Sequence, residues 1–164
     1  MSPATKAPSV SLDEALRMTG RWRNEGRRIV FTNGCFDLLH PGHIDYLQRA
    51  RALGDVLVIG LNSDASVRGL KGPQRPINPL HDREVMLGAL ACVDLIVPFD
   101  EPTPIHVISG LLPDILVKGG DYEPDDIVGA KEVRGNGGEV IVMPFIPGHS
   151  SSALIQRIVD LHQD

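Results

Sequence analysis

The chain has 164 residues, of which 42% are hydrophobic and 23% are charged, and these values are ordinary for one globular domain. Its net charge of -5 argues against broad nucleic-acid binding, which needs a basic face, but leaves room for a local basic pocket. No apolar run is long enough to span a bilayer and no secretory segment is recognisable. We therefore expect a cytoplasmic protein that binds neither nucleic acid nor membrane.

The N-terminal part of the chain divides into two segments. Residues 1–10 are rich in Pro, Ala and Ser, a composition that predicts disorder. A capping box formed by Ser11 and Glu14 then predicts a helix that ends near Gly26. We expect this helix to begin a single domain over residues 11–164.

Five short apolar runs, separated by helical patterns, follow this first helix. They predict strands over residues 28–32, 55–61, 93–99, 114–117 and 139–143. Helices are expected over residues 41–53, 81–91, 103–112 and 125–134 and from the serine run at 150–152 to Leu161, with a loop over 65–75. This alternation predicts an α/β fold with a Rossmann-like, doubly wound, five-stranded parallel sheet. Ligands of such folds lie at the carboxyl ends of the strands.

The most informative stretch, residues 31–43, lies at the end of the first predicted strand. His40 and His43 bracket a helix that begins near Pro41, and the N–H groups and dipole of a helix N-terminus attract phosphate. Imidazole donors there can follow charge as it develops on a phosphoryl group. The alternatives are a plain helix start or a two-histidine metal site, for which no third ligand lies near in sequence.

Two basic residues are further candidates for contact with phosphate. Lys71 can act as a point charge on an α-phosphate, although it can equally be a solvated surface lysine. Arg83 can hold a β- or γ-phosphate, or it can pair with Asp82 or Glu84.

The serine run before the last predicted helix has more hydroxyl groups than helix capping requires. One serine is sufficient to cap a helix, so Ser150, Ser151 and Ser152 together favour phosphate binding. His149 is close enough to this run to touch a nucleotide.

A second ligand-binding segment is predicted after the fourth strand. In Lys118-Gly119-Gly120-Asp121, the paired glycines let the backbone approach a ligand and Asp121 can accept hydrogen bonds from it. A simple turn would also use two glycines, but would not need the flanking Lys118 and Asp121.

Asp37, in the first loop, can orient a substrate or help to hold Mg²⁺, or it can merely cap the following turn. We predict no dedicated metal-ligand residues.

His40-Pro41-Gly42-His43 resembles the HxGH signature of the nucleotidyltransferase superfamily. Segments 32–43, 70–72, 117–122 and 148–152 occur together and in order, and this set is similar to the heptose 1-phosphate adenylyltransferase domain of ADP-heptose synthases. The resemblance covers about residues 11–162. The sugar-kinase half of the bifunctional members is not in this sequence, so the chain resembles the stand-alone form.

The resemblance implies a reaction in lipopolysaccharide precursor synthesis. D-glycero-D-manno-heptose 1-phosphate would attack the α-phosphate of ATP directly, with Mg²⁺, to give ADP-heptose and pyrophosphate. It also implies a homo-oligomer.

The resemblance also implies roles for particular residues. His40, His43 and Lys71 would be catalytic, and the nucleotide would be bound by Asn33, Gly34, Cys35, Phe36, Arg83, the Lys118–Asp121 segment, His149 and the serine run. Asp37, Lys118 and Asp121 would bind the substrate. Related cytidylyltransferases have Thr in place of Cys35, Ser151 and Ser152, but Cys keeps the backbone contact and Ser keeps the hydroxyl.

Two other functions remain open on sequence grounds. A cytidylyltransferase acting on glycerol 3-phosphate, or on a similar small phosphate ester, would share the histidine motif, and physical reasoning alone does not select the base. A non-catalytic nucleotide-sensing module would also bind nucleotide, although the presence of both histidines, Lys71 and the serine run weighs against it.

Overall fold

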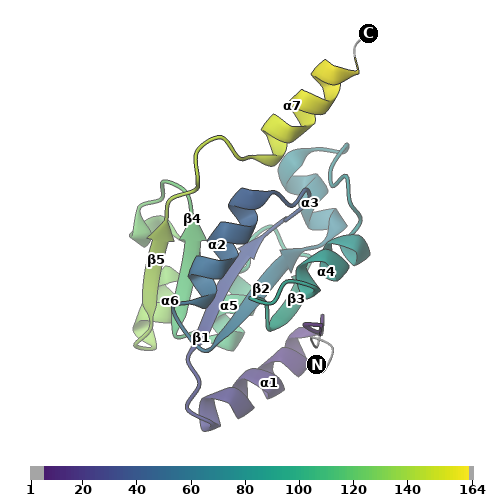
Figure 1. The fold of residues 1–164 in the computed structure, drawn as a ribbon. Helices are drawn as coiled ribbons and strands as arrows, with labels where there is room; N and C mark the ends of the chain where they lie inside the picture. Colours follow the sequence, from purple (N-terminus) through teal and green to yellow (C-terminus); the bar gives the residue numbers. More distant parts are fainter. Residues whose placement is uncertain (1–5, 163–164) are drawn as a thin grey trace.

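The computed structural model describes residues 6–162 (Figure 1). At its centre is a five-stranded sheet with the order β3-β2-β1-β4-β5, in which every strand pair is parallel. The strands are β1 (Ile29–Gly34), β2 (Val56–Asn62), β3 (Leu95–Phe99), β4 (Ile115–Gly119) and β5 (Glu139–Met143). Helices pack on both faces, so the predicted doubly wound α/β fold is confirmed.

Helices connect the strands along the described chain. They are α1 (Leu12–Asn24), α2 (Pro41–Arg51), α3 (Asp64–Lys71), α4 (Leu80–Gly88), α5 (Ile105–Leu111), the 3₁₀-helix η1 (Pro124–Asp126), α6 (Ala130–Gly135) and α7 (Ser151–Leu161). The predicted cap of α1 is present, since Ser11 accepts a hydrogen bond from the Glu14 N–H. The expected loop over residues 65–75 is wrong in its first part. Ser63 caps α3 there by accepting from the Ser66 N–H at 3.2 Å, and Val67 is buried.

The strand side chains alternate between two apolar cores, one on each face of the sheet. Val30 and Leu57 pack with buried residues of α2 and α4. Ile29 and Val56, one position earlier on the same strands, pack with α1, α5 and α6. Because both faces are covered, these strands appear in the sequence as nearly continuous apolar runs.

The expected disorder over residues 1–10 is corrected for residues 6–10, and residues 1–5 lie outside the described range. Ala7 N donates to Gly88 O at 2.9 Å, and the residue Ala7 is 6% exposed. Pro8 O accepts from Ile96 N and Val10 N donates to Ile96 O, at 2.9 and 3.0 Å. The segment therefore runs parallel to β3 and covers the edge of the sheet.

The last helix, α7, projects from the body of the domain in Figure 1. None of its residues is buried. Leu154, Ile158, Val159 and Leu161 on this helix are between 37% and 66% exposed. Within residues 6–162, no helix combines the length and the apolar character needed to cross a membrane.

Candidate functional site

A cavity of about 820 Å³ opens at the carboxyl ends of β1, β2 and β4. It lies where the strand order reverses between β1 and β4, which is where ligands of open α/β sheets bind. Most of the site residues expected from the sequence line this cavity, namely Asn33, Gly34, Cys35, Phe36, Asp37, His43, Lys71, Lys118, Gly119, Gly120, Asp121 and Ser151.

The two motif histidines lie together at the start of α2. Their rings are stacked, with centroids 3.8 Å apart and planes inclined by 21°. Gly42 permits this arrangement, because a Cβ atom there would lie 3.0 Å from His40 Nδ1. Nδ1 of each ring is buried and has no hydrogen-bond partner among the described residues. Buried polar nitrogens are rarely left unpaired, so this pair is better explained as part of a ligand site than as a helix cap.

Burial also determines the charge of these rings. It lowers the pKa of His43 to about 4, and the positive charges of His40 and Lys71 act in the same direction. Burial, with a smaller effect of His149, lowers the pKa of His40. Both rings are therefore neutral at neutral pH, and each has one N–H donor and one unprotonated acceptor nitrogen.

This shift predicts a pH dependence of stability. The pKa of His43 is about 4 in the folded protein against an ordinary value of 6.5, so the unfolded chain binds more protons between these limits. Stability therefore falls as the pH decreases from about 6.5 towards 4. The variant His43→Gln lacks this titrating group, so we expect it to lose less stability than the parent over this range. The expected difference is about 1–2 kcal/mol, less than the full pKa shift would give, because the ring is partly exposed. Urea denaturation at both pH values measures this difference, and equal losses would contradict it.

Two lysines bring positive charge to the cavity. Lys71 is the last residue of α3, and Lys118 lies in β4 with its Nζ 5.5 Å from the centroid of the Tyr122 ring. Burial lowers the pKa of Lys118. Neither lysine is paired with a carboxylate of the described residues. Their charge is therefore available to an anionic ligand.

The serine run and His149 are only partly brought to the cavity. Ser151 lines it, and its Oγ donates to Leu38 O at 3.2 Å. Ser150 caps α7 by accepting from Ala153 N at 3.0 Å. His40 lines an adjoining groove, and His149 lies beside it with ring centroids 6.2 Å apart. His149, Ser150 and Ser152 are not part of the cavity lining.

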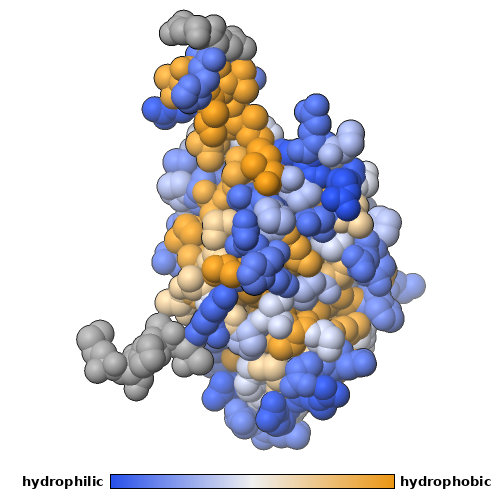
Figure 2. Space-filling view, turned by 90° about the vertical axis from the view of Figure 1, so that its right-hand side faces the viewer, coloured by the Kyte–Doolittle hydropathy of each residue, from blue (hydrophilic) through white to orange (hydrophobic). Residues whose placement is uncertain are grey.

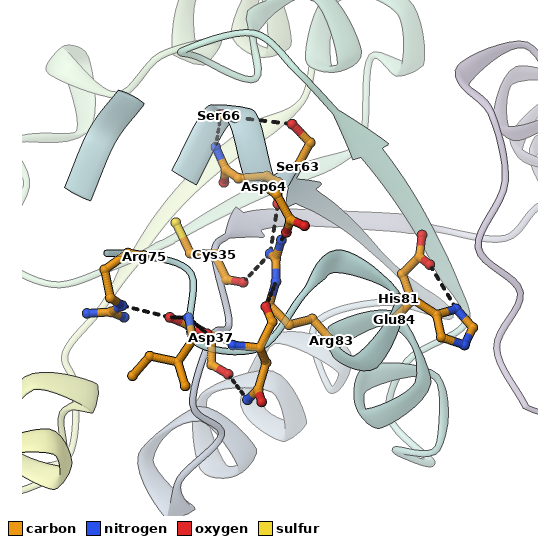
Figure 3. Close-up of polar contacts among 12 residues, drawn as sticks. Cys35, Asp37, Ser63, Asp64, Ser66, Arg75, His81, Arg83 and Glu84 are labelled. Atoms are coloured by element: carbon orange, nitrogen blue, oxygen red, sulfur yellow. Dashed lines mark hydrogen bonds and ion pairs between the residues drawn. The ribbon is translucent and has the colours of Figure 1, made fainter. Parts of the chain in front are cut away.

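Asp37 and Arg83 are engaged by other protein groups. The Asp37 carboxylate accepts from Arg75 Nε at 2.7 Å and from the Ile77 and Asn78 N–H groups. Burial alone would raise the pKa of Asp37, but these hydrogen bonds and the Arg75 charge hold it below its ordinary value. Arg83 is fully buried and pairs with Asp64, not with Asp82 or Glu84 (Figure 3). Arg83 is also absent from the cavity lining.

Sequence reasoning missed several residues that line the cavity, among them Tyr46, Asn62 and Phe145. A Cβ atom at Gly119 would lie 2.4 Å from Phe145 Cε1, so the aromatic ring packs directly on this glycine. The Tyr46 hydroxyl lies 2.7 Å from Thr32 Oγ1. Two features of the sequence could have predicted these positions. Tyr46 follows His43 by three residues and so lies on the same face of α2, and Phe145 comes just after the carboxyl end of β5.

A parallel α/β sheet, with two histidines at a helix N-terminus beside a cavity lined by Lys71 and Lys118, has the features of a phosphate-binding site of the phosphoryl- or nucleotidyl-transfer class. The Cytidylyltransferase-like family model matches residues 31–157. The chain belongs to this family, which confirms the superfamily expected from the HxGH motif.

Similar proteins agree with this assignment. The bifunctional protein HldE of Azorhizobium caulinodans is 51% identical over 148 residues, which cover 90% of this chain and 31% of that protein. HldE of Pectobacterium carotovorum is 57% identical over 136 residues, 83% of this chain and 28% of that protein. The chain thus spans about a third of the length of these curated relatives. The solved lipopolysaccharide core biosynthesis protein from Thermoplasma volcanium superposes with a TM-score of 0.61 at 27% identity, covering 74% of this chain and 98% of that one.

Proposed function

We propose that the protein is an adenylyltransferase that converts D-glycero-D-manno-heptose 1-phosphate and ATP to ADP-heptose and pyrophosphate. The observation that carries the proposal is the cavity in which His43, whose Nδ1 has no partner among the described residues, lies with Lys71, Lys118 and Ser151. The similarity to the HldE proteins and to a lipopolysaccharide core biosynthesis protein supports a role in lipopolysaccharide precursor synthesis.

The proposed chemistry is one in-line displacement. A phosphate oxygen of the sugar phosphate attacks the α-phosphorus of ATP and forms the new P–O bond. The bond from that phosphorus to the bridging oxygen breaks, and pyrophosphate leaves with the electron pair. No protein nucleophile is required, so positioning and charge stabilisation account for catalysis.

We assign each residue a role from its position. His43 in the cavity and His40 in the adjoining groove donate hydrogen bonds to the phosphate oxygens, and Lys71 stabilises the charge that develops on the α-phosphate. The backbone of residues 33–36 lies along the triphosphate, with Ser151 contributing a hydroxyl. Lys118, Asp121 and the two glycines between them contact the nucleotide or the sugar phosphate. A bound triphosphate would favour the protonated imidazoles and so raise the histidine pKa values.

We propose that Mg²⁺ enters together with ATP. Mg²⁺ is commonly held by substrate phosphates and only one or two carboxylates. Among residues 6–162, no group of three His, Cys, Asp or Glu side chains is arranged to hold a metal ion. We therefore propose that the oxygens of the triphosphate supply most of the ligands. Asp121, which lines the cavity and is exposed, is the carboxylate we assign to it.

The test is pyrophosphate release from ATP and from CTP, each with heptose 1-phosphate or with glycerol 3-phosphate. We expect release only with ATP, heptose 1-phosphate and Mg²⁺, and loss of release when EDTA removes the metal. Release with CTP and glycerol 3-phosphate would overturn the assignment in favour of the cytidylyltransferase. Nucleotide binding without release from any pair would favour the sensing module.

We also propose that the protein forms a homo-oligomer through α7. This is supported by the exposed apolar residues of α7. Figure 2 shows hydrophobic surface beside hydrophilic residues at the top of the molecule, where this helix lies. Sedimentation of the parent is expected to give a species larger than the 17.8 kDa chain, and Ile158→Glu is expected to reduce it to the monomer. A parent that sediments as a monomer at micromolar concentration would remove this proposal.

A further inference from the structure

Arg83 joins three parts of the site through one buried guanidinium. Its Nη1 donates to the carbonyl oxygens of Cys35 and Asn62, both at 2.7 Å. Its Nη2 donates to Asp64 Oδ1 at 2.8 Å, and Arg83 is 0% exposed. Because Asp64 is the first residue of α3, this contact ties the start of that helix to the loop after β1 (Figure 3).

Asp37, in the same loop, forms a second connection, to the chain that follows the C-terminal end of α3. Its carboxylate pairs with Arg75 Nε at 2.7 Å and accepts from the N–H groups of Ile77 and Asn78 at 2.8 Å. Arg75 N in turn donates to Gly72 O at 3.1 Å. The chain just after Lys71 is therefore attached to Asp37.

Lys71 lies between these two connections. It is the last residue of α3, and its helix begins at the Asp64–Arg83 pair. The turn that follows it ends at the Arg75–Asp37 pair. Both pairs fasten to residues 35–37, the loop that lines the cavity beside His43.

We propose that Asp37, Arg75 and Arg83 are positioning residues whose two ion pairs hold the segment 64–75 against the 35–37 loop, and so place Lys71 at the cavity before a nucleotide binds. The inference deepens the proposed function, and its kinetic part rests on that function. It differs from the sequence-based expectation, in which Arg83 and Asp37 bind phosphate or substrate and Lys71 lies on a loop.

The physical reason is preorganisation. A cation stabilises a developing negative charge most when it is already in place, because no reorganisation is then needed during reaction. An eight-residue helix attached at both ends gives an exposed lysine such a fixed position. One partner of each pair is buried, Arg83 at 0% and Asp37 at 1% exposure, and leaving such a charge unpaired is costly, so each connection should resist opening.

The first test is independent of turnover. Hydrogen–deuterium exchange of the ligand-free protein is compared for the parent, Arg75→Ala and Arg83→Lys, with Arg68→Ala as the control. Arg68 is an exposed arginine of the same helix. We expect exchange in residues 64–72 to rise at least about tenfold in the first two variants and to stay unchanged in the control. Unchanged exchange in Arg75→Ala would overturn the proposal, and this variant serves if Arg83→Lys does not fold.

The second test is a double-mutant cycle on kcat/KM with Arg75→Ala and Lys71→Ala. We expect Arg75→Ala to reduce kcat/KM by about 10- to 100-fold in the parent, but less than about threefold when Lys71 is already alanine. Equal losses in both backgrounds would overturn the positioning role, because a direct ligand to phosphate acts independently of Lys71. Arg75→Lys is expected to restore part of the rate. If the parent releases no pyrophosphate, the proposed function fails while the exchange result still decides the positioning of α3.

Discussion

Replacing His43 with alanine is expected to reduce kcat by about 100- to 1000-fold, or about 3 kcal/mol of transition-state stabilisation. The ring lines the cavity, stacks on His40 and has a buried Nδ1 atom without a partner in the described structure. In the proposed reaction its contact with phosphate would strengthen as charge develops in the transition state, so kcat should fall much more than KM rises. Steady-state pyrophosphate release with ATP and heptose 1-phosphate measures both constants.

His106→Ala is the matched control for this substitution. His106 is an exposed residue of α5, and it is not among the residues that line the cavity. We expect the control to retain kcat within about twofold. A His43→Ala enzyme with the kcat of the control would remove His43 from the catalytic groups and return it to a structural role at the start of α2.

Replacing Ile59 with alanine is expected to destabilise the domain by about 2–5 kcal/mol. Ile59 is 0% exposed in β2 and belongs to the apolar core on the face covered by α2 and α4. The shortened side chain loses apolar burial and leaves a cavity in a close-packed interior. Urea denaturation followed by circular dichroism gives the free energy of unfolding.

Ile77→Ala removes the same atoms from an exposed position. Ile77 is 51% exposed, and its backbone N–H, which binds Asp37, is retained in the variant. We expect a change below about 0.5 kcal/mol. Similar losses in the two variants would mean that the core on this face of the sheet does not carry the stability assigned to it.

The sequence determined the class of fold and the location of the site because these depend on local patterns. Continuous apolar runs separated by helical periodicity required a parallel sheet covered on both faces. Since the carboxyl ends of parallel strands meet at one edge, residues 33–36 after β1 and Lys118 to Asp121 at the end of β4 could be placed at one cavity. His40, Pro41, Gly42 and His43 were recognisable because their spacing at a helix start is itself a local signal.

Only the tertiary structure decided which polar side chains remain available to a ligand. Arg83 and Asp37 are charged residues of the kind that bind ligands. In the structure, however, Arg83 pairs with Asp64 and Asp37 pairs with Arg75, and each partner comes from a separate segment of the chain. The edge position of residues 7–10 likewise depends on hydrogen bonds to Gly88 and Ile96. Such pairings join residues far apart in the sequence, whereas propensity and periodicity report only on neighbours along the chain. For this reason the sequence located the cavity, while the fold determined that Lys71 and His43 face it and Arg83 does not.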